Sequence, residues 1–482
     1  MSVTVRQIDP QCKPAEYLTV PQLETIIAPE VIQEVLTAYE AWEQREKKLN
    51  MQAMIYLIIA LALYPQCSTR EVYRRLLEGL CSGLDQQEEV PTAGALCQRR
   101  QQLAVTPLRA LFARIARPVA LPQTRAAFRF GLRVVAVDGT LENLPDTDAN
   151  RTVFPYHCLD ELARSPFPQA RCVLLMECGT HVIFDAEFTT VQQGELGSVL
   201  TLLERSLTPE MLLLCDAGIC YGPVLLGARS KGAHVLGRID SRSWAKPWVR
   251  LHDGSYLVKV YRDGRHRTGE SVTARVIEDR LRDPQTGQLG KPIRLLTTLL
   301  DPLQYPIEAL IRLYHERWEL EQGIDEIKTH LCLSARTLRS QTPQGVEQEL
   351  YGLLLAYFAV RTLMYAAALQ ADWDPDEVSF VHTLNVLQRS QWRLMQASDF
   401  QRPALRQALL QEVCQERVPP RRLRLQARVV KRTHSRYKRK WYAHLHAPCL
   451  KESFLDLVVL LIYMVLGYAP TIDDESACQA RV

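Results

Sequence analysis

The stretch YHERWELEQGIDEIK, residues 314–328, combines a central carboxylate with three groups that can bind phosphate. Its Tyr314, Arg317, Glu321 and Lys328 are separated by three, four and seven residues. At about 100° per residue, an α-helix places these four side chains within an arc of roughly 60°. The stretch therefore predicts a helical face suited to a metal-dependent enzyme that acts on a nucleic acid backbone.

The same helix has a simpler interpretation. Helices rich in Glu, Arg and Lys usually face solvent, and Arg317 with Glu321 can form an i, i+4 ion pair worth roughly 0.3 kcal/mol. Carboxylates elsewhere in the chain decide between the two interpretations.

Two aspartates end short apolar runs that predict buried strands. Asp138 follows VVAV and Asp216 follows LLLC, and each precedes a small residue. Folds of the α/β class build sites at the carboxyl edge of the sheet, although Asp before Gly or Ala-Gly is also a common turn signal. With Glu321, the two aspartates provide oxygen ligands for two Mg²⁺ ions, for which Mn²⁺ is the alternative. We expect Asp138 to bridge both ions, with Asp216 and Glu321 each holding one.

Positive charge is concentrated in two segments. From Val90 to Val137 there are eight arginines and no acidic residue, and from Arg417 to Lys451 there are twelve Lys or Arg and no acidic residue. The remaining chain has 38 basic and 54 acidic residues, although the net charge of the whole is only +4. This segregation indicates two surfaces for a polyanion, with a solvated face or a basic tail as the alternative.

The N-terminal part predicts helices, with Ser68 and Thr92 as N-caps of two of them. The helix after Thr92 carries Arg99 and Arg100. This pair of helices is compatible with a helix-turn-helix DNA reader, in which both arginines contact DNA. Ordinary helix packing explains the same pattern, so both interpretations stay open.

The composition, with 47% apolar and 23% charged residues, is that of a soluble globular protein. Its 13 cysteines are scattered without a CxxC pair, which favours neither a disulfide framework nor a zinc site. The apolar stretches 51–64 and 457–467 fall short of the roughly 20 residues that span a bilayer. Because the N-terminal segment does not read as a signal peptide, we expect a cytoplasmic protein with no membrane contact.

The spacing Y-x2-R-x3-E-x6-K around Glu321, with Asp138 in DGT and Asp216 in DAG, resembles the DDE transposases of bacterial insertion sequences. The similarity is to the insertion sequence four family in particular. Residues 27–36 and 342–357 are similar to recurrent segments of that family, so the resemblance spans most of the chain. It implies a DNA transposase in which the three carboxylates are catalytic and bind the metal.

The resemblance implies an α/β fold with an RNase H-like mixed-sheet catalytic core and an inserted β-rich subdomain. A helical N-terminal domain and a helical, basic C-terminal region complete it. The expected boundaries are 1–115 for the N-terminal DNA-binding domain, 116–218 for the first part of the core, 219–304 for the β-rich insertion, 305–370 for the second part of the core with the catalytic helix, and 371–482 for the C-terminal region.

The resemblance also implies cut-and-paste transposition through hairpin ends. Its steps are hydrolytic nicking, attack of the freed 3′-hydroxyl on the opposite strand, hairpin opening, and strand transfer into target DNA. The partners are the terminal inverted repeats of the element and the target DNA. Because two ends are joined, we expect a homodimer in the DNA complex of a bacterial, nucleoid-associated protein.

In that family the Tyr, Arg and Lys of the signature contact phosphates near the cleaved end, which assigns this role to Tyr314, Arg317 and Lys328. A Trp of the β-rich insertion holds the base that leaves the stack. Trp244 and Trp248 are the candidates, and a structural role is the alternative for each.

Further phosphate contacts are expected from two arginines after the signature and from the basic C-terminal segment. The residues so assigned are Arg336, Arg339, Arg421, Arg422, Arg424, Lys431 and Arg432.

Two other functions remain open. A catalytically inactive or domesticated transposase-derived DNA-binding protein would not need all three carboxylates. A stand-alone metal nuclease would not need the long N-terminal and basic C-terminal parts. The nearby Glu142, Asp146, Asp148 and Glu195 are not expected to bind metal, because none combines a strand end with the family pattern.

Overall fold

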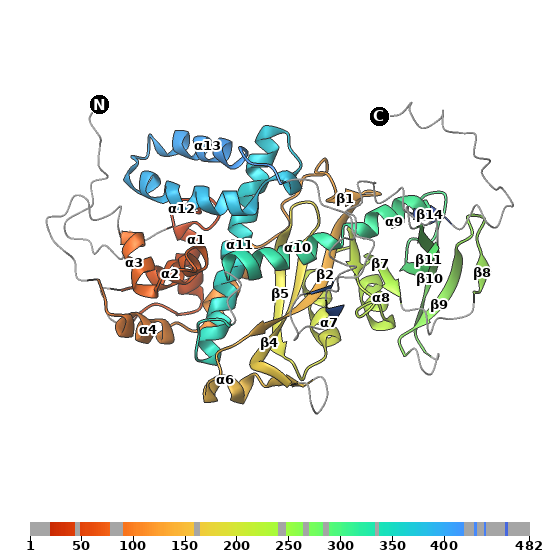
Figure 1. Ribbon diagram of the computed structural model, residues 1–482, viewed down its shortest axis with the longest axis horizontal. Coiled ribbons are helices and arrows are strands. Elements are labelled where there is room, and N and C mark those ends of the chain that lie inside the picture. The colour runs from red at the N-terminus through yellow and green to blue at the C-terminus, as the bar shows by residue number, and fades with distance from the viewer. Residues whose placement is uncertain are drawn as a thin grey trace. The chain divides into compact units, whose positions relative to one another are not determined.

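The computed structural model describes residues 20–43, 49–77, 90–158, 164–239, 247–263, 269–282, 289–332 and 337–418, with three short strands beyond them. The chain divides into two compact units. The first contains Met1–Cys215, Gly227–Ala233 and Glu316–Val418, and the second contains Asp216–Leu226, His234–His315 and Pro419–Val482. Each unit combines helices with β-strands (Figure 1).

The N-terminal part of the first unit is helical, as predicted. Its helices are α1 (Pro29–Ala38), α2 (Met51–Leu63), α3 (Thr69–Leu77), α4 (Ala93–Gln102) and α5 (Val105–Ile115). The hydroxyl of Ser68 accepts a hydrogen bond from the N–H of Glu71, and that of Thr92 accepts one from Ala95. These bonds satisfy N–H groups that have no partner within the helix, which confirms both predicted caps.

A mixed sheet forms the centre of the first unit. Its strands are β1 (Phe128–Arg129), β2 (Leu132–Asn143), β3 (Tyr156–Cys158), β4 (Arg164–Glu177), β5 (Val182–Thr190) and β6 (Met211–Cys215). β2 pairs antiparallel with β4, and β4 with β5, whereas β6 lies parallel to β2 on its other side. The crossover that parallel strands require contains α7 (Glu195–Ser206). This order confirms the α/β class and the RNase H-like mixed-sheet core.

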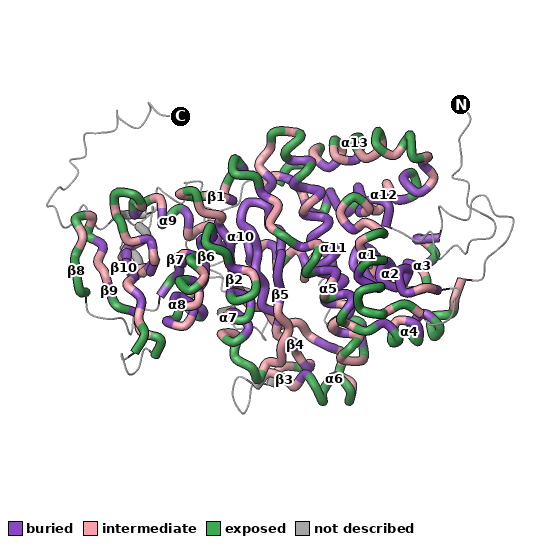
Figure 2. The backbone as a smooth tube through the Cα atoms, turned by 180° about the vertical axis from the view of Figure 1, so that it is seen from behind, coloured by how far each residue is buried: buried purple, intermediate pink, exposed green. Residues whose placement is uncertain are grey.

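The two faces of this sheet carry different helices. Because side chains alternate along a strand, Asp138, Thr140 and Glu142 of β2 share one face, and Gly139 lies on the other. On the first face, Phe188 of β5 makes an edge-on contact with Tyr351 of α11 (Pro343–Ala371). On the second face, Arg205 of α7 pairs with Asp185 of β5. Figure 2 shows the buried middle of these strands. A further short helix, α6 (Asp148–Val153), follows β2.

The predicted helix over residues 314–328 is not one continuous α-helix. α9 (Ile307–His315) ends in the second unit, α10 (Trp318–Asp325) follows in the first, and the π-helix η3 (Glu326–Leu331) continues α10. Bonds from Glu319 to Glu316 and from Leu320 to Arg317 span only three residues. Since three-residue bonds tighten a helix and π-type bonds widen it, a constant 100° per residue does not describe this stretch.

α11 is the most apolar long helix among the described residues, and most of residues 342–357, a segment similar to the family, lies in it. It is long and apolar enough to cross a membrane, but 83% of its most apolar window is buried within the protein. Arg361 interrupts its apolar residues. Such burial is what a core helix of a soluble fold shows, and this helix packs against α2, α5 and β5.

The second unit contains the β-rich block. Its strands are β7 (His234–Ile239), β8 (Val249–Arg250), β9 (Tyr256–Tyr261), β10 (Ser271–Arg282), β11 (Leu289–Thr297) and the short β14 (Val458–Leu460). The order β7-β11-β10-β9-β8 is antiparallel throughout, and β14 also pairs with β10. Fully buried Arg275 is held by Asp253, Ser255 and the carbonyl of Tyr305.

Helices continue the first unit after α11. They are the 3-10 helix η4 (Pro375–Glu377), α12 (Phe380–Gln396) and α13 (Arg402–Val413).

Three further elements complete the described chain. α8 (Gly222–Ser230) follows β6, and the short strands β12 (Val429–Val430) and β13 (Lys438–Arg439) pair in parallel. Arg421, Arg422, Arg424, Lys431 and Arg432 lie outside the described residues.

Candidate active site

Asp138 lies on β2, on the sheet face that α10 approaches. One carboxylate oxygen, Oδ1, accepts a hydrogen bond from the N–H of Gly139 at 2.8 Å. The other, Oδ2, lies 3.5 Å from Nη1 of Arg317. The buried strand before it, Val134–Val137, fixes this carboxylate in position, while its side chain remains 21% exposed.

Arg317 joins two of the predicted catalytic carboxylates. It precedes α10, and its Nη2 donates to Oε1 of Glu321 at 2.8 Å, while its Nη1 faces Asp138. The Arg317 side chain is only 9% exposed, whereas that of Glu321 is 33% exposed. The structure therefore brings together a strand carboxylate and a helix carboxylate that are far apart in sequence. Oxygen ligands of this kind suit a hard divalent cation.

Asp216 directly follows β6 and belongs to the second unit. Its Oδ1 accepts hydrogen bonds from the N–H groups of Gly218 and Ile219, at 2.9 and 3.0 Å. These bonds form the turn that the Asp-Ala-Gly sequence predicts, and they leave Oδ2 outside the turn. In the paired strands β2 and β6, Ala136 lies opposite Leu214. Asp138 comes two residues after Ala136, and Asp216 comes two residues after Leu214.

Lys328 of η3 binds the end of β2 rather than solvent. Its Nζ donates to the carbonyl oxygen of Leu141 at 2.7 Å and lies 3.3 Å from Oε1 of Glu142. Burial raises the pKa of Glu142, and the ammonium of Lys328 partly opposes that rise. Tyr314, the fourth member of the signature, is half-buried on α9 in the second unit.

Arg99 and Arg100, which are predicted to contact DNA, both have partners within the protein. Arg99 is buried, donates to the carbonyl of Leu49 at 2.7 Å and pairs with Glu43 at 3.0 Å. Arg100 donates to Gln348 and to other groups near the start of α11. Both guanidinium groups are therefore occupied by helix packing, which was the alternative interpretation of this segment.

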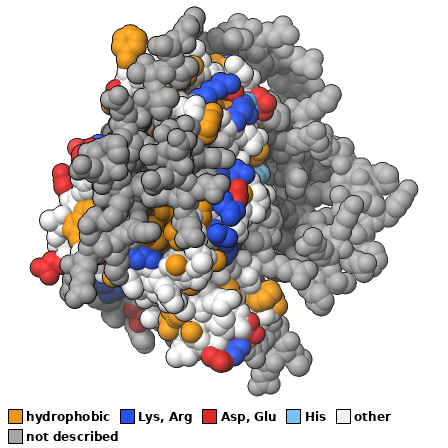
Figure 3. Space-filling model, turned by 90° about the vertical axis from the view of Figure 1, so that its left-hand side faces the viewer, with side chains coloured by type: hydrophobic (Ala, Val, Ile, Leu, Met, Phe, Trp, Pro, Cys, Tyr) orange, Lys and Arg blue, Asp and Glu red, His pale blue; other side chains and the backbone are white. Residues whose placement is uncertain are grey.

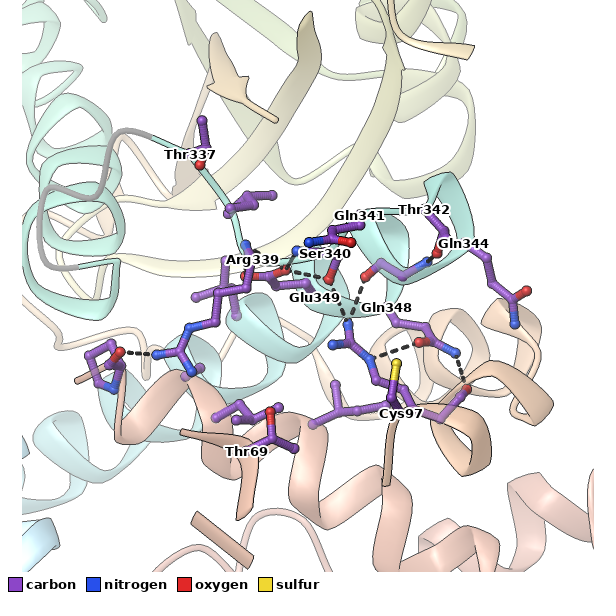
Figure 4. Close-up of a pocket in the computed structure, with 18 of the residues that line it drawn as sticks. Thr69, Cys97, Thr337, Arg339, Ser340, Gln341, Thr342, Gln344, Gln348 and Glu349 are labelled. Atoms are coloured by element: carbon purple, nitrogen blue, oxygen red, sulfur yellow. Dashed lines mark hydrogen bonds between the residues drawn. The ribbon is translucent and has the colours of Figure 1, made fainter. Parts of the chain in front are cut away.

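Arg100 also borders a cavity of 440 Å³. Its guanidinium donates to Ser340 and Gln348 there. Arg339 and Glu349 also line this cavity (Figure 4). The guanidinium of Arg339 donates to the carbonyl oxygens of Pro65 and Cys67, although its side chain is exposed. The cavity wall is thus internally hydrogen-bonded and attaches α4 to α11.

Exposed arginines of α3 were not assigned from the sequence. Arg70 and Arg74 are both exposed, and Arg74 pairs with Glu71 one turn away. Figure 3 shows Lys and Arg side chains gathered on the side of the first unit that lies at the left of Figure 1, where α3 lies. The high charge of α3 between buried apolar residues was the signal that could have identified them.

The tryptophan candidates differ in what the structure describes. Trp248 is 61% exposed, and Nζ of Lys259 lies 5.2 Å from the centre of its ring. A tryptophan so exposed does not serve the core. Trp244 and Arg336 lie outside the described residues.

The spare carboxylates have other partners. Asp146 and Asp148 both pair with Arg151. Glu195 lies against Gly139, where an added Cβ would come within 1.6 Å of its Oε1. This places Glu195 on the sheet face opposite the Asp138 side chain.

A second acidic group lies behind α10. His181, Glu319 and Asp376 bring one ligand atom each within 4.8 Å of one another. However, Nδ1 of His181 lies 2.7 Å from Arg361, which can only donate, so the proton of the neutral ring belongs on Nε2. That nitrogen lies 2.8 Å from Asp376. A metal would need its lone pair, so these residues form a charge network rather than a metal site.

Comparisons with known proteins agree with this arrangement. Residues 18–113 match the family described as insertion element 4 transposase N-terminal, and residues 129–359 match the transposase DDE domain. Over 423 residues the chain is 31% identical to the transposase InsG for insertion sequence element IS4 of Escherichia coli (strain K12). This alignment covers 85% of this chain and 91% of the relative.

Among solved structures, the chain is similar to a piggyBac transposase synaptic complex with hairpin DNA. The TM-score is 0.40 at 11% identity, covering 85% of this chain and 87% of the other. The family matches and the extent of the sequence identity establish the relationship. The chain therefore belongs to the insertion element 4 family of DDE transposases, metal-dependent enzymes that cleave DNA.

Proposed function

We propose that this protein moves an insertion sequence by a cut-and-paste reaction through hairpin ends, with Asp138, Asp216 and Glu321 as its catalytic carboxylates. The observation that carries the proposal is the contact of one guanidinium, Arg317, with both Asp138 and Glu321. A surface ion pair would need only the i, i+4 partner on the helix. The additional strand carboxylate makes this a converging acidic site.

The donor set suits two Mg²⁺ ions, with Mn²⁺ as an alternative, because the three assigned side chains are carboxylates, whose oxygens hard divalent cations prefer. Asp138 would bridge the ions, Glu321 would hold one, and Asp216 would hold the other from the end of β6. When bound, the ions activate the attacking water or 3′-hydroxyl and stabilise the leaving oxygen. Connectivity supports the role of Asp216, since β6 runs parallel to β2 and Asp216 is the next residue.

This chain's own residues would hold the DNA. Tyr314, Arg317 and Lys328 would contact phosphates near the cleaved end, where a hydroxyl, a guanidinium fork and an ammonium donate hydrogen bonds. Exposed Trp248, or else Trp244, would stack on the base that leaves the helix.

Other basic groups would follow the DNA backbone. They are Arg70 and Arg74 of the helical N-terminal domain, Arg336, Arg339 and the basic segment that starts at Arg421. The five-segment division predicted from the sequence is retained as part of this proposal.

Membership of the family implies a protein that acts on DNA in the cytosol. We propose that it binds the terminal inverted repeats of its own element, works as a homodimer on two ends, and associates with the nucleoid. A catalytically inactive, domesticated derivative is the alternative. The Asp138–Arg317–Glu321 arrangement disfavours it, because a protein that only binds DNA has no need for converging carboxylates.

The test is incubation of the full chain with labelled element ends and Mg²⁺. We expect nicks, then hairpins, then excised ends. Asp138→Asn and Glu321→Gln should lose all strand breakage and still bind the ends. Asp325→Asn is the matched control, because Asp325 is an exposed carboxylate on the same helix that accepts a bond from Thr329. Strand breakage by either active-site variant would refute the proposed site, and nicks without hairpins would refute the hairpin route.

A further inference from the structure

Three residues of α10 and the start of η3 are not used by the catalytic proposal. Glu319 and Gly323 each lie two residues from Glu321, roughly 160° around an α-helix from it, and Glu326 is the first residue of η3. Each of the three contacts a different part of the first unit. The back of the catalytic helix is therefore held at three successive positions.

Glu326 is held by an arginine in the core. Arg361, in the middle of α11, is 2% exposed. Its Nε donates to Oε2 of Glu326 at 2.9 Å, and its Nη2 donates to Oε1. The planar guanidinium thus binds both carboxylate oxygens, a geometry that fixes direction as well as distance. Buried Tyr357, one turn earlier on α11, donates to the same carboxylate at 3.0 Å.

Arg361 also connects this carboxylate to the turn between β4 and β5. Its Nη2 donates to Nδ1 of His181, and Nε2 of His181 faces both Asp376, at 2.8 Å, and Glu319, at 3.5 Å. Glu319 in turn accepts a hydrogen bond from the N–H of Gly179. The network therefore attaches both ends of α10 to the sheet and to α11.

Close packing sets the height of α10 above the sheet. An added Cβ at Gly323 would lie 2.8 Å from the hydroxyl of Tyr357 and 3.3 Å from Sδ of Met176 on β4. An added Cβ would therefore have to displace the Tyr357 hydroxyl, and glycine permits this approach without that shift. Glu321 lies two residues from Gly323 on the same helix, so its distance from Asp138 depends on this contact.

We propose that Arg361, acting through Glu326, is a positioning residue that fixes the carboxylate of Glu321 relative to Asp138. The inference rests on the proposed function. Burying charged groups costs free energy that their pairing does not reliably offset, so an apolar pair of the same size would serve stability equally well. An apolar pair cannot fix the rotation of α10 about its axis or its position along that axis. The bidentate bond fixes both, because it is directional.

The test uses two variants, each as the full chain with element-end DNA. One is Arg361→Lys, and the other is an apolar double variant that combines Glu326→Leu and Arg361→Met. Two quantities are measured. The first is the affinity for Mn²⁺, monitored through the loss of the EPR signal of free Mn²⁺. The second is the rate of end cleavage as a function of metal concentration. We expect both variants to bind Mn²⁺ about 10–100-fold more weakly, the range for residues that orient metal ligands. The double variant should keep the thermal stability of the wild type.

Arg205→Lys is the matched control, because Arg205 pairs with Asp185 on the opposite face of the same sheet. It should leave Mn²⁺ binding unchanged. Wild-type Mn²⁺ binding and cleavage in the double variant would overturn the positioning role, since a structural role alone changes stability and not metal affinity. If Arg361→Lys does not fold, the double variant still decides. Glu321→Gln separates the two proposals: retained cleavage in that variant would refute the proposed site itself.

Discussion

Arg317 donates a 2.8 Å hydrogen bond to Glu321 one helical turn further along the chain. The same guanidinium faces Asp138 across the gap between α10 and β2. An arginine so placed keeps two like charges at a defined separation. The ion pair that the sequence suggested as a surface feature is therefore part of the site.

Arg317→Ala should reduce cleavage far more than DNA binding. Loss of the guanidinium leaves Asp138 and Glu321 to repel each other, so the single-turnover rate should fall about 10–100-fold. DNA affinity should fall by less than about threefold, since one phosphate contact among many is lost. Rates with labelled ends and affinities from fluorescence anisotropy check this. A large loss of affinity with an unchanged rate at saturation would assign Arg317 to phosphate binding alone.

Lys328 should act as a phosphate contact that Glu142 restrains. Lys328→Gln should weaken binding of element ends and reduce the slope of log affinity against log salt by about one. Glu142→Gln removes the carboxylate that pairs with Lys328, so affinity should stay equal or rise. Lys231→Gln is the control, because Lys231 pairs with exposed Glu204, away from the proposed site. Weaker binding by Glu142→Gln would instead show that the pair orients Lys328.

Gly139→Ala should destabilise the protein because Glu195 occupies the space of the new methyl group. Overpacking at such a site costs about 1–3 kcal/mol. Glu195→Ala removes the obstacle, so the double variant should recover most of the lost free energy of unfolding. Urea denaturation of the wild type, both single variants and the double variant forms the required cycle. Additive losses would mean that the two side chains do not compete for this space.

Asp279 of β10 should make stability depend on pH. Burial raises the pKa of Asp279 to about 6. The folded state therefore binds the proton more tightly than the unfolded chain, whose aspartates titrate near 3.9. The resulting stabilisation is complete below about pH 4 and is lost as the pH rises through about 6. Asp279→Asn should increase the free energy of unfolding at pH 7.5 by on the order of 1 kcal/mol, after allowance for solvent screening, and should raise the melting temperature there. At pH 4 it should change neither quantity. An equal effect at both pH values would exclude titration of Asp279 as the cause.

Local features of this protein followed from the sequence. The caps at Ser68 and Thr92 formed as predicted because an N-cap bonds an N–H only three residues away. The ends of the strands before Asp138 and Asp216 were marked by apolar runs and small residues. The spacing of the signature, together with the two aspartates, was specific enough to indicate the family.

Tertiary structure alone decided which partners these residues have. Arg99 was predicted to contact DNA and Arg361 was given no role, yet Arg99 is buried against Glu43 and Arg361 against Glu326, a residue 35 positions away. The helix at residues 314–328 changes its geometry where it packs on its neighbours. Periodicity determines which face of an element is apolar, whereas the partner of a charge depends on chain segments that only folding brings together, and on the low-dielectric interior that makes an unpaired charge too costly to retain.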